Sequence, residues 1–154
     1  MPQDATPDVI PAPITVDALF LANAAETPGG LLYSLGGGWT RCWPSPGQKY
    51  PFERPISIVL MIRIPWGQAN REHEFTLSVR DGEERSIVRG GEPATGKFKV
   101  GRDVNLLDGM SQLATVAFNA PAELAIPGIY HVVIELNGTE AKRIQFEALD
   151  GPPR

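Results

Sequence analysis

The residue types that carry out nucleophilic or metal chemistry are scarce in this chain. Cys42 is the only cysteine, and the histidines are His73 and His131. Zinc sites gather Cys, His and acidic ligands at short sequence spacings, and neither histidine stands in an HExxH arrangement. No GxSxG motif presents a serine that a histidine could activate. We therefore predict a protein that is not an enzyme and that holds no metal and no cofactor.

A weaker catalytic alternative rests on Cys42 or His73. Arg41 and Trp43 flank the cysteine, and a neighbouring cation lowers the pKa of a thiol. Cysteines that serve as small buried core residues are nevertheless commoner than reactive ones. Catalysis would need a polar partner within hydrogen-bonding reach of the thiol or the imidazole.

The segment Gly91–Lys97 nearly matches a phosphate-binding P-loop. Such a loop needs a Ser or Thr directly after its lysine to hold Mg²⁺, and a helix N-terminus to receive the phosphates. Phe98 stands in the Ser/Thr position, and the residues after it are typical of a strand. The formal net charge of −4 also disfavours binding to a phosphate backbone. We predict a glycine-rich loop and no nucleic-acid partner.

Binding chemistry is concentrated in the connector Pro65–His73, PWGQANREH. Trp and Arg are enriched at interface hot spots because each buries a large area and still forms directed hydrogen bonds. The predicted partner-binding residues are Trp39, Trp66, Asn70, Arg71 and His73. The alternative is that Trp66 folds back to cap the end of the domain, while Asn70 and Arg71 brace the loop.

A second functional hypothesis starts from Trp39 and Trp43, which have the same parity and so share one face of a strand. With Trp66 they could form stacking surfaces for a carbohydrate or a small apolar ligand. An exposed pair on one face would favour this hypothesis, and three buried tryptophans would contradict it. The leading prediction is a non-enzymatic protein-interaction or assembly module, with a protein partner or self-association.

The elements that must position these residues are strands. Ile56–Ile64 has Ile or Leu at every even position, and Phe75–Val79 has apolar residues at every odd position. Period-two alternation of this length is typical of half-buried strands, here a pair joined by the connector. Further strands are predicted over residues 14–24, 31–35, 85–89, 97–100, 114–121, 130–135 and 143–148.

The chain contains 16 glycines and 15 prolines, and those that fall between the runs act as turn and loop signals. About eight or nine short strands predict an all-β, immunoglobulin-like antiparallel β-sandwich. We expect one domain over residues 14–149, a proline-rich tail over 1–13 and a C-terminal tail over 150–154. The first residues lack the basic region of a secretory signal, and no apolar run is long enough to span a bilayer. A cytoplasmic protein without a membrane partner is the expectation.

The last two strands form the clearest hairpin in the sequence. Tyr130, Val132 and Ile134 on one strand, and Ile144 and Phe146 on the other, place even-numbered residues in the core. A two-residue turn would pair even positions with odd ones. We therefore predict a three-residue loop, residues 136–138, with positive φ at the glycine of that loop and a type I turn followed by a bulge.

Apolar residues also occur on the faces that should point outward. Val59 and Met61 lie opposite the isoleucine series, and Val133 lies opposite the core set of its own strand. Apolar residues on a nominal outer face predict cover by another segment of the chain or by another subunit.

The motifs LYSLGGGWT at 32–40, PWxxANRxH at 65–73 and PGIY at 127–130 occur in this order before the closing hairpin. In these motifs the chain resembles an uncharacterised bacterial family of stand-alone β-sandwich domains of unknown function, over about residues 14–149. The resemblance implies a small sandwich, and it implies no catalytic residues. Likeness of fold does not supply a function.

Overall fold

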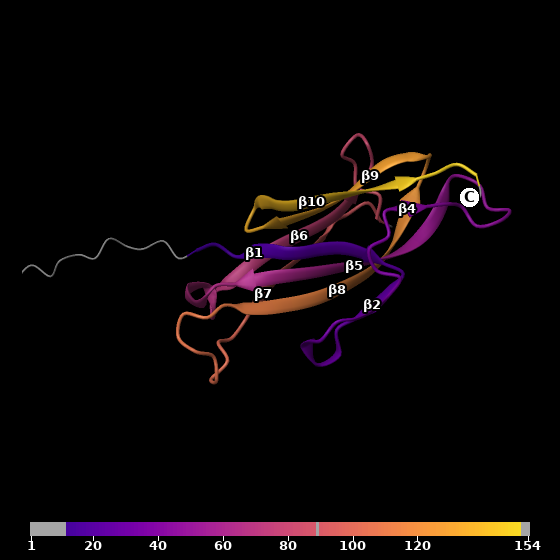
Figure 1. The fold of residues 1–154 in the computed structure, drawn as a ribbon. Helices are drawn as coiled ribbons and strands as arrows, with labels where there is room; N and C mark the ends of the chain where they lie inside the picture. The colour runs from indigo at the N-terminus through magenta and orange to yellow at the C-terminus, as the bar shows by residue number, and fades with distance from the viewer. Residues whose placement is uncertain (1–11, 89, 152–154) are drawn as a thin grey trace, which may run out of the picture.

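Ten strands make up most of the described part of the protein, residues 12–88 and 90–151 of a computed structural model (Figure 1). One sheet has the order β1-β5-β8, formed by Thr15–Ala22, Phe52–Ile64 and Gln112–Leu124. The other has the order β4-β10-β9-β6-β7, formed by Arg41–Cys42, Thr139–Ala148, Gly128–Leu136, Glu72–Arg80 and Ala94–Lys99. A separate hairpin contains β2 (Ala24–Glu26), the 3₁₀ turn η1 (Pro28–Gly30) and β3 (Tyr33–Leu35), and a second turn, η2, spans Trp66–Gln68. The predicted all-β fold is confirmed, and the short strands β2, β3 and β4 raise the number in the described residues to ten.

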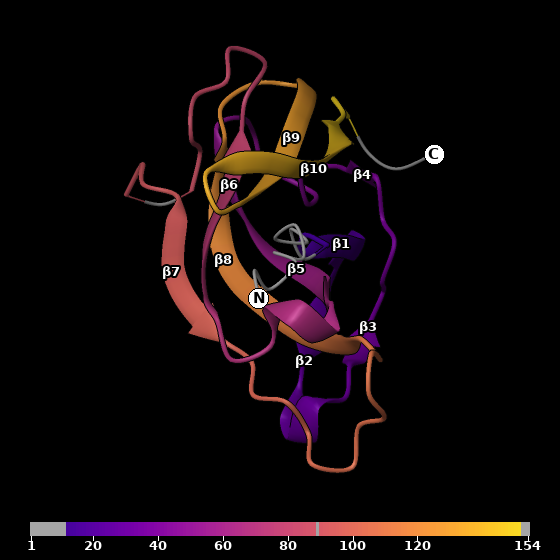
Figure 2. The same ribbon diagram turned by 90° about the vertical axis from the view of Figure 1, so that its left-hand side faces the viewer.

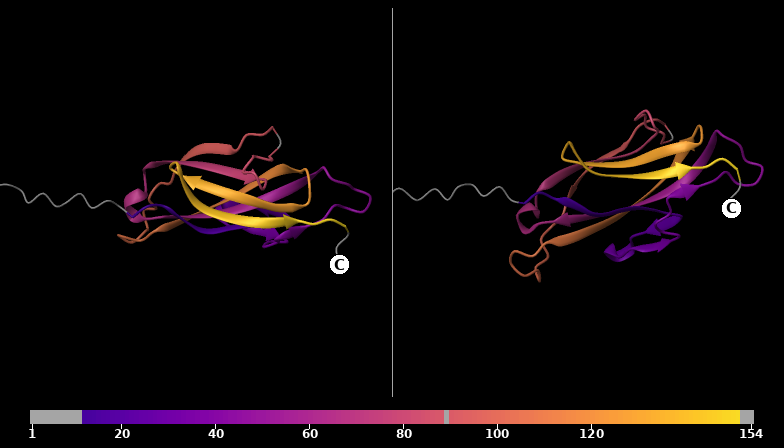
Figure 3. Two further views of the ribbon diagram at one scale, coloured as in Figure 1. Left: turned by 90° about the horizontal axis from the view of Figure 1, so that it is seen from above. Right: turned by 45° about the horizontal axis from the view of Figure 1, so that its top comes forward.

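The strand order is that of an immunoglobulin-like sandwich. β1, β5 and β8 take the places of strands A, B and E, and β10, β9, β6 and β7 those of G, F, C and C′. The two sheets form separate layers, as the turned views show (Figures 2 and 3). At the start of β9 the Tyr130 hydroxyl donates a hydrogen bond of 2.5 Å to the Ile126 carbonyl oxygen. This is the tyrosine corner of the fold, and it fixes the loop that enters β9.

Most of the predicted tails, 1–13 and 150–154, lie outside the described residues. The first strand begins at Thr15 and the last ends at Ala148. No helix in the described part of the chain is long and apolar enough to cross a membrane.

The core lies between the two sheets. β5 supplies its even-numbered residues from Ile56 to Ile64, all buried, and the second sheet supplies Val132, Ile134 and Phe146 to the same cluster. Burying an apolar side chain of this size stabilises a fold by about 1.5–3 kcal/mol. The predicted core faces of β5, β9 and β10 are therefore confirmed.

The two strands that flank the connector, β5 and β6, both supply the core but do not pair with each other. β5 bonds to β1 and β8, whereas β6 bonds to β7 and β9. The connector between them crosses from one sheet to the other (Figure 1). Alternation in a sequence identifies the buried face of a strand, but it does not identify the strand's partner.

Two predicted strand boundaries also differ. β8 does not end at Pro121, which lies directly opposite Pro55 in the ladder with β5. The Glu123 N–H donates to Ile87 O and not to β5, so the odd-numbered residues of β8 direct their backbone groups away from β5. Pro121 is one of these residues, and its missing N–H therefore removes no bond between β5 and β8. The strand predicted over 85–89 consists of isolated bridges at Ser86 and Val88, and residue 89 lies outside the described chain.

The closing hairpin has a two-residue turn, so the predicted three-residue loop is wrong. Leu136 pairs with Thr139, and both Asn137 (φ 51°) and Gly138 (φ 82°) have positive φ, as a type I′ turn requires. A bulge at Ala141 then shifts the register and restores the pairing of even with even residues. The parity argument and the positive φ at Gly138 are correct, but the extra residue sits in the strand and not in the turn.

Another segment of the chain covers the outer face at Val59. The β2–β3 hairpin lies over β5 and β8, where Ala22, Ala25 and Val59 form a second buried cluster. Phe20 and Met61 are half-buried at its margin. The predicted cover is therefore intramolecular at this position.

An ion cluster spans the outer face of the second sheet at Val133. The cross-strand neighbours of Val133 are Ser78 and Arg143. Arg143 Nη1 contacts Glu84 Oε1 at 2.5 Å, and Arg80 Nη1 contacts Glu84 Oε2 at 3.0 Å. The apolar stems of the two arginines can cover the valine while their charged groups meet Glu84, and Val133 is fully buried.

Glu84→Gln is expected to lower the melting temperature near neutral pH. Hydrogen bonds from Arg143 and Arg80 lower the pKa of Glu84 from 4.5 to about 2. Because the folded-state pKa lies below the unfolded one, the carboxylate stabilises the fold above about pH 4.5 and ceases to do so as the pH falls towards about 2. The difference between wild type and variant in thermal melts should therefore shrink over this range.

Glu83→Gln is the matched control, because the Glu83 side chain is 75% exposed and contacts Arg85, whose side chain is 70% exposed. It should leave the melting temperature unchanged. Equal melting temperatures for wild type and Glu84→Gln at neutral pH would contradict a stabilising role of the Glu84 carboxylate.

Candidate functional site

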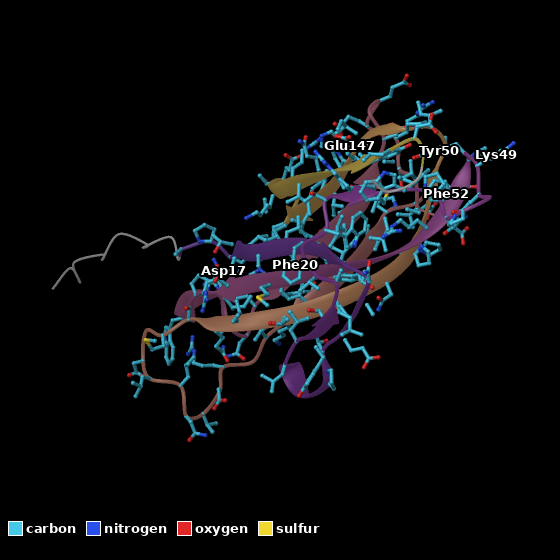
Figure 4. The ribbon with its side chains drawn as sticks, turned by 45° about the vertical axis from the view of Figure 1, so that its right-hand side comes forward. Asp17, Phe20, Lys49, Tyr50, Phe52 and Glu147 are labelled. Carbon is cyan, nitrogen blue, oxygen red and sulfur yellow. The ribbon has the colours of Figure 1, made fainter. Side chains whose placement is uncertain are left out.

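The predicted site residues lie at two opposite ends of the sandwich. Trp39 lies beside Arg54 near the start of β5, whereas Trp66 follows the end of β5 at Ile64. The ten residue steps from Arg54 to Ile64 span about 33 Å in an extended strand. Figure 4 shows the same separation, with Phe52 at one end of the molecule and Asp17 towards the other. The structure therefore does not bring Trp39 together with the connector.

Trp39 packs within its own end of the domain. Its half-buried ring meets Phe146 edge to face, with ring centroids 5.4 Å apart. The Arg54 guanidinium carbon lies 4.6 Å from the Trp39 ring centroid, so a cation covers one face of the indole. Trp43 is also half-buried. The tryptophans are thus neither an exposed pair nor fully buried.

The connector is clamped to the loop that precedes β8. The Arg102 guanidinium carbon lies 3.7 Å from the Trp66 ring centroid, and Arg102 Nη2 donates a hydrogen bond of 2.6 Å to the Trp66 carbonyl oxygen. Asn70, with φ 63°, donates its backbone N–H to Val100 O at 2.8 Å. Trp66 and Asn70 therefore hold the two chain segments together. Arg71 is exposed.

His73 faces the interior of the domain. It is 4% exposed on the inner face of β6. Its Nε2 lies 3.1 Å from Gln68 O, which can only accept, and its Nδ1 lies 3.2 Å from the Asn137 amide nitrogen, which donates. These two partners fit a ring in which Nε2–H donates to Gln68 O and Nδ1 accepts from the Asn137 amide. The imidazole therefore serves to join the connector to the β9–β10 turn.

Cys42 is a core residue. It is 2% exposed and pairs with Ala148 where β4 runs parallel to β10. Burial raises the pKa of its thiol, and the charge of Arg54 opposes this only in part. A nucleophilic cysteine needs the opposite shift. In the described residues no group of three or more Cys, His and acidic side chains is placed to hold a metal.

Sequence reasoning missed two exposed apolar patches. The loop patch consists of Val104, Leu107, Met110 and Leu113, which are 96%, 75%, 53% and 44% exposed. The hairpin patch consists of Leu31, Tyr33 and Leu35, which are 64%, 58% and 74% exposed. Both segments project from the outer side of the β1-β5-β8 sheet (Figures 1 and 2). The loop patch recurs every three residues and the hairpin patch every two, and this spacing is the signal in the sequence that could have marked them. Their exposure and their shared side of the sheet are visible only in the structure.

Arg102→Ala is expected to lower the free energy of unfolding by about 1–3 kcal/mol, because it removes a cation–π contact and a charged hydrogen bond. Chemical denaturation measures this change. Arg71→Ala is the matched control: it removes an exposed arginine of the connector itself and should change stability by less than about 0.5 kcal/mol. A larger loss from Arg71→Ala than from Arg102→Ala would contradict the clamp.

The Cys42 thiol should not react with a disulfide reagent while the protein is folded. Its burial and raised pKa both suppress the thiolate. Thiol titration should give one equivalent after unfolding in guanidinium chloride and almost none before. Rapid reaction of the native protein would instead support a reactive thiol.

Comparison with known proteins identifies the family to which the chain belongs. No curated protein matches the sequence. A solved structure with partial likeness is the Pseudomonas fluorescens alkylpurine DNA glycosylase AlkC bound to DNA containing an abasic site analogue, with a TM-score of 0.32 and 14% identity. That match covers 89% of this chain but 30% of the glycosylase chain, and at this TM-score it bears on neither fold nor function. The model of a family of unknown function, DUF6941, matches residues 17–149, so the chain belongs to this family.

Proposed function

We propose that this domain is a non-enzymatic protein-interaction or assembly module. Its contact surface is the outer side of the β1-β5-β8 sheet together with the loop patch and the hairpin patch. The observation that carries the proposal is the exposure of seven large apolar side chains in two segments that project from the same side of the sheet. Exposed apolar clusters of this kind mark interaction sites on small domains.

The surface between the two patches supports the same function. Leu113 lies opposite Arg63 in the β5–β8 ladder, and Thr115 lies opposite Met61. Arg63 in turn is fixed by Asp17, with 2.9 Å from Nε to Oδ2. Apolar side chains with a polar margin are the usual arrangement of a protein interface.

The Arg102 clamp gives the connector a role in this module. Arg102 belongs to the loop that carries the loop patch, and its contacts with Trp66 fix where this loop leaves the domain. Trp66 and Asn70 are then positioning residues. The carbohydrate or apolar ligand alternative, and a cytoplasmic location, stay predictions.

A pull-down from native lysate tests the module. The double variant Leu107→Asp, Met110→Asp places two charges on the loop patch and should reduce capture of any bound protein by at least about tenfold. The control Thr139→Asp, Ala141→Asp adds the same charges at exposed positions of the other sheet. Circular dichroism melts verify that both variants fold. Equal capture by both double variants would contradict the proposed surface.

A further inference from the structure

The long strand β8 has an open edge. Along one side it bonds to β5 from Gln112 to Leu124. On the other side the bond from Glu123 N–H to Ile87 O is formed near its end, at 2.9 Å. Because backbone groups alternate along a strand, the odd-numbered residues 113, 115, 117 and 119 also direct their N–H and C=O groups away from β5. Within the described residues no backbone group meets these four.

This edge also lacks the features that prevent strands from pairing. Residues 112–120, QLATVAFNA, contain no charged residue and no proline. The other edges differ: β7 carries Lys97 and Lys99, β1 is interrupted by a bulge at Asp17, and β4 is two residues long. Charges, bulges and short length are the usual protections of an edge strand. β8 is therefore suited to receive another strand.

The sequence of this edge fits an antiparallel copy of itself. A two-fold axis at Val116 places Thr115 opposite the partner's Ala117, and Leu113 opposite the partner's Asn119. All four outward-facing residues then lie in hydrogen-bonded pairs, because in an antiparallel ladder these pairs alternate with pairs such as Val116 with its own copy. No like charges meet along the seam.

The two apolar patches indicate that the occupant is a second copy and not a lone strand of another protein. The loop patch leads into the first residues of β8, whereas the hairpin lies over its other half, where Asn119 Nδ2 donates to Ala25 O at 3.4 Å. Antiparallel pairing brings the loop patch of each copy beside the hairpin patch of the other, on one side of a continuous sheet. A single added strand would satisfy the edge but leave both patches exposed.

We infer that this chain forms a two-fold symmetric dimer in which β8 pairs edge to edge with β8 of a second copy. The inference rests on the proposed function and names its partner. It joins two three-stranded sheets into one sheet of six strands, and it encloses the loop and hairpin patches between the copies.

Sedimentation equilibrium of the full chain over a range of concentrations tests the dimer. Thr115→Pro removes an N–H that points away from β5, so it costs no bond within the monomer. Each dimer loses two symmetry-related donors, and the dissociation constant should rise at least about 30-fold. Thr115→Ala keeps the N–H and should dimerise like wild type. Thr115→Lys keeps the backbone N–H and places two lysines near the two-fold axis, so it should also weaken the dimer. It provides the test if the proline variant does not fold.

A wild type that sediments as a monomer at all concentrations would overturn the dimer. The proposed function would then still be decided by the pull-down, where the acidic loop-patch variant either loses a different partner or does not. A wild-type dimer that both Thr115→Pro and Thr115→Lys leave unchanged would overturn pairing through β8. A dimer lost in these two variants and kept in Thr115→Ala supports it.

Discussion

The structure depends on one constraint, which is that β5 carries buried apolar residues on both of its faces. Its even-numbered residues need the second sheet, and Val59 on the opposite face needs a separate cover. β5 is also the central strand of its sheet and bonds to β1 and β8, so its two edges as well as its two faces are covered. The β2–β3 hairpin exists where it does because it shields Val59, and this brings the exposed residues of the hairpin patch to the outer side of the sheet.

The same constraint explains the connector. Because β5 and β6 belong to different sheets, the chain between them must cross the end of the sandwich, where no ladder can hold it. Arg102 on the Trp66 ring, and His73 between Gln68 and Asn137, replace the missing ladder bonds. Trp66, Asn70 and His73, three of the predicted binding residues, thus stabilise a crossing, and the crossing in turn anchors the loop that leads into β8.

Local patterns in the sequence predict the local parts of this fold. The alternation in Ile56–Ile64 identifies a strand and its core face, and the parity of the closing hairpin is correct. The bulge at Ala141 has no sequence signature, so the turn type was wrong. The contacts that fix the connector could not be predicted, because they join residues that are distant in sequence. Arg102 is 36 residues from Trp66, and Asn137 is 64 residues from His73.

Residue-resolved amide hydrogen exchange tests most directly whether the edge of β8 is open in the monomer and pairs in a dimer. Even-numbered amides such as Val116 bond to β5 and should exchange slowly at every protein concentration. The odd-numbered amides of residues 113–119 should exchange rapidly in the monomer and become protected as the concentration rises. Slow exchange of the odd-numbered set in a monomeric sample, or rapid exchange of that set at every concentration, would contradict the account.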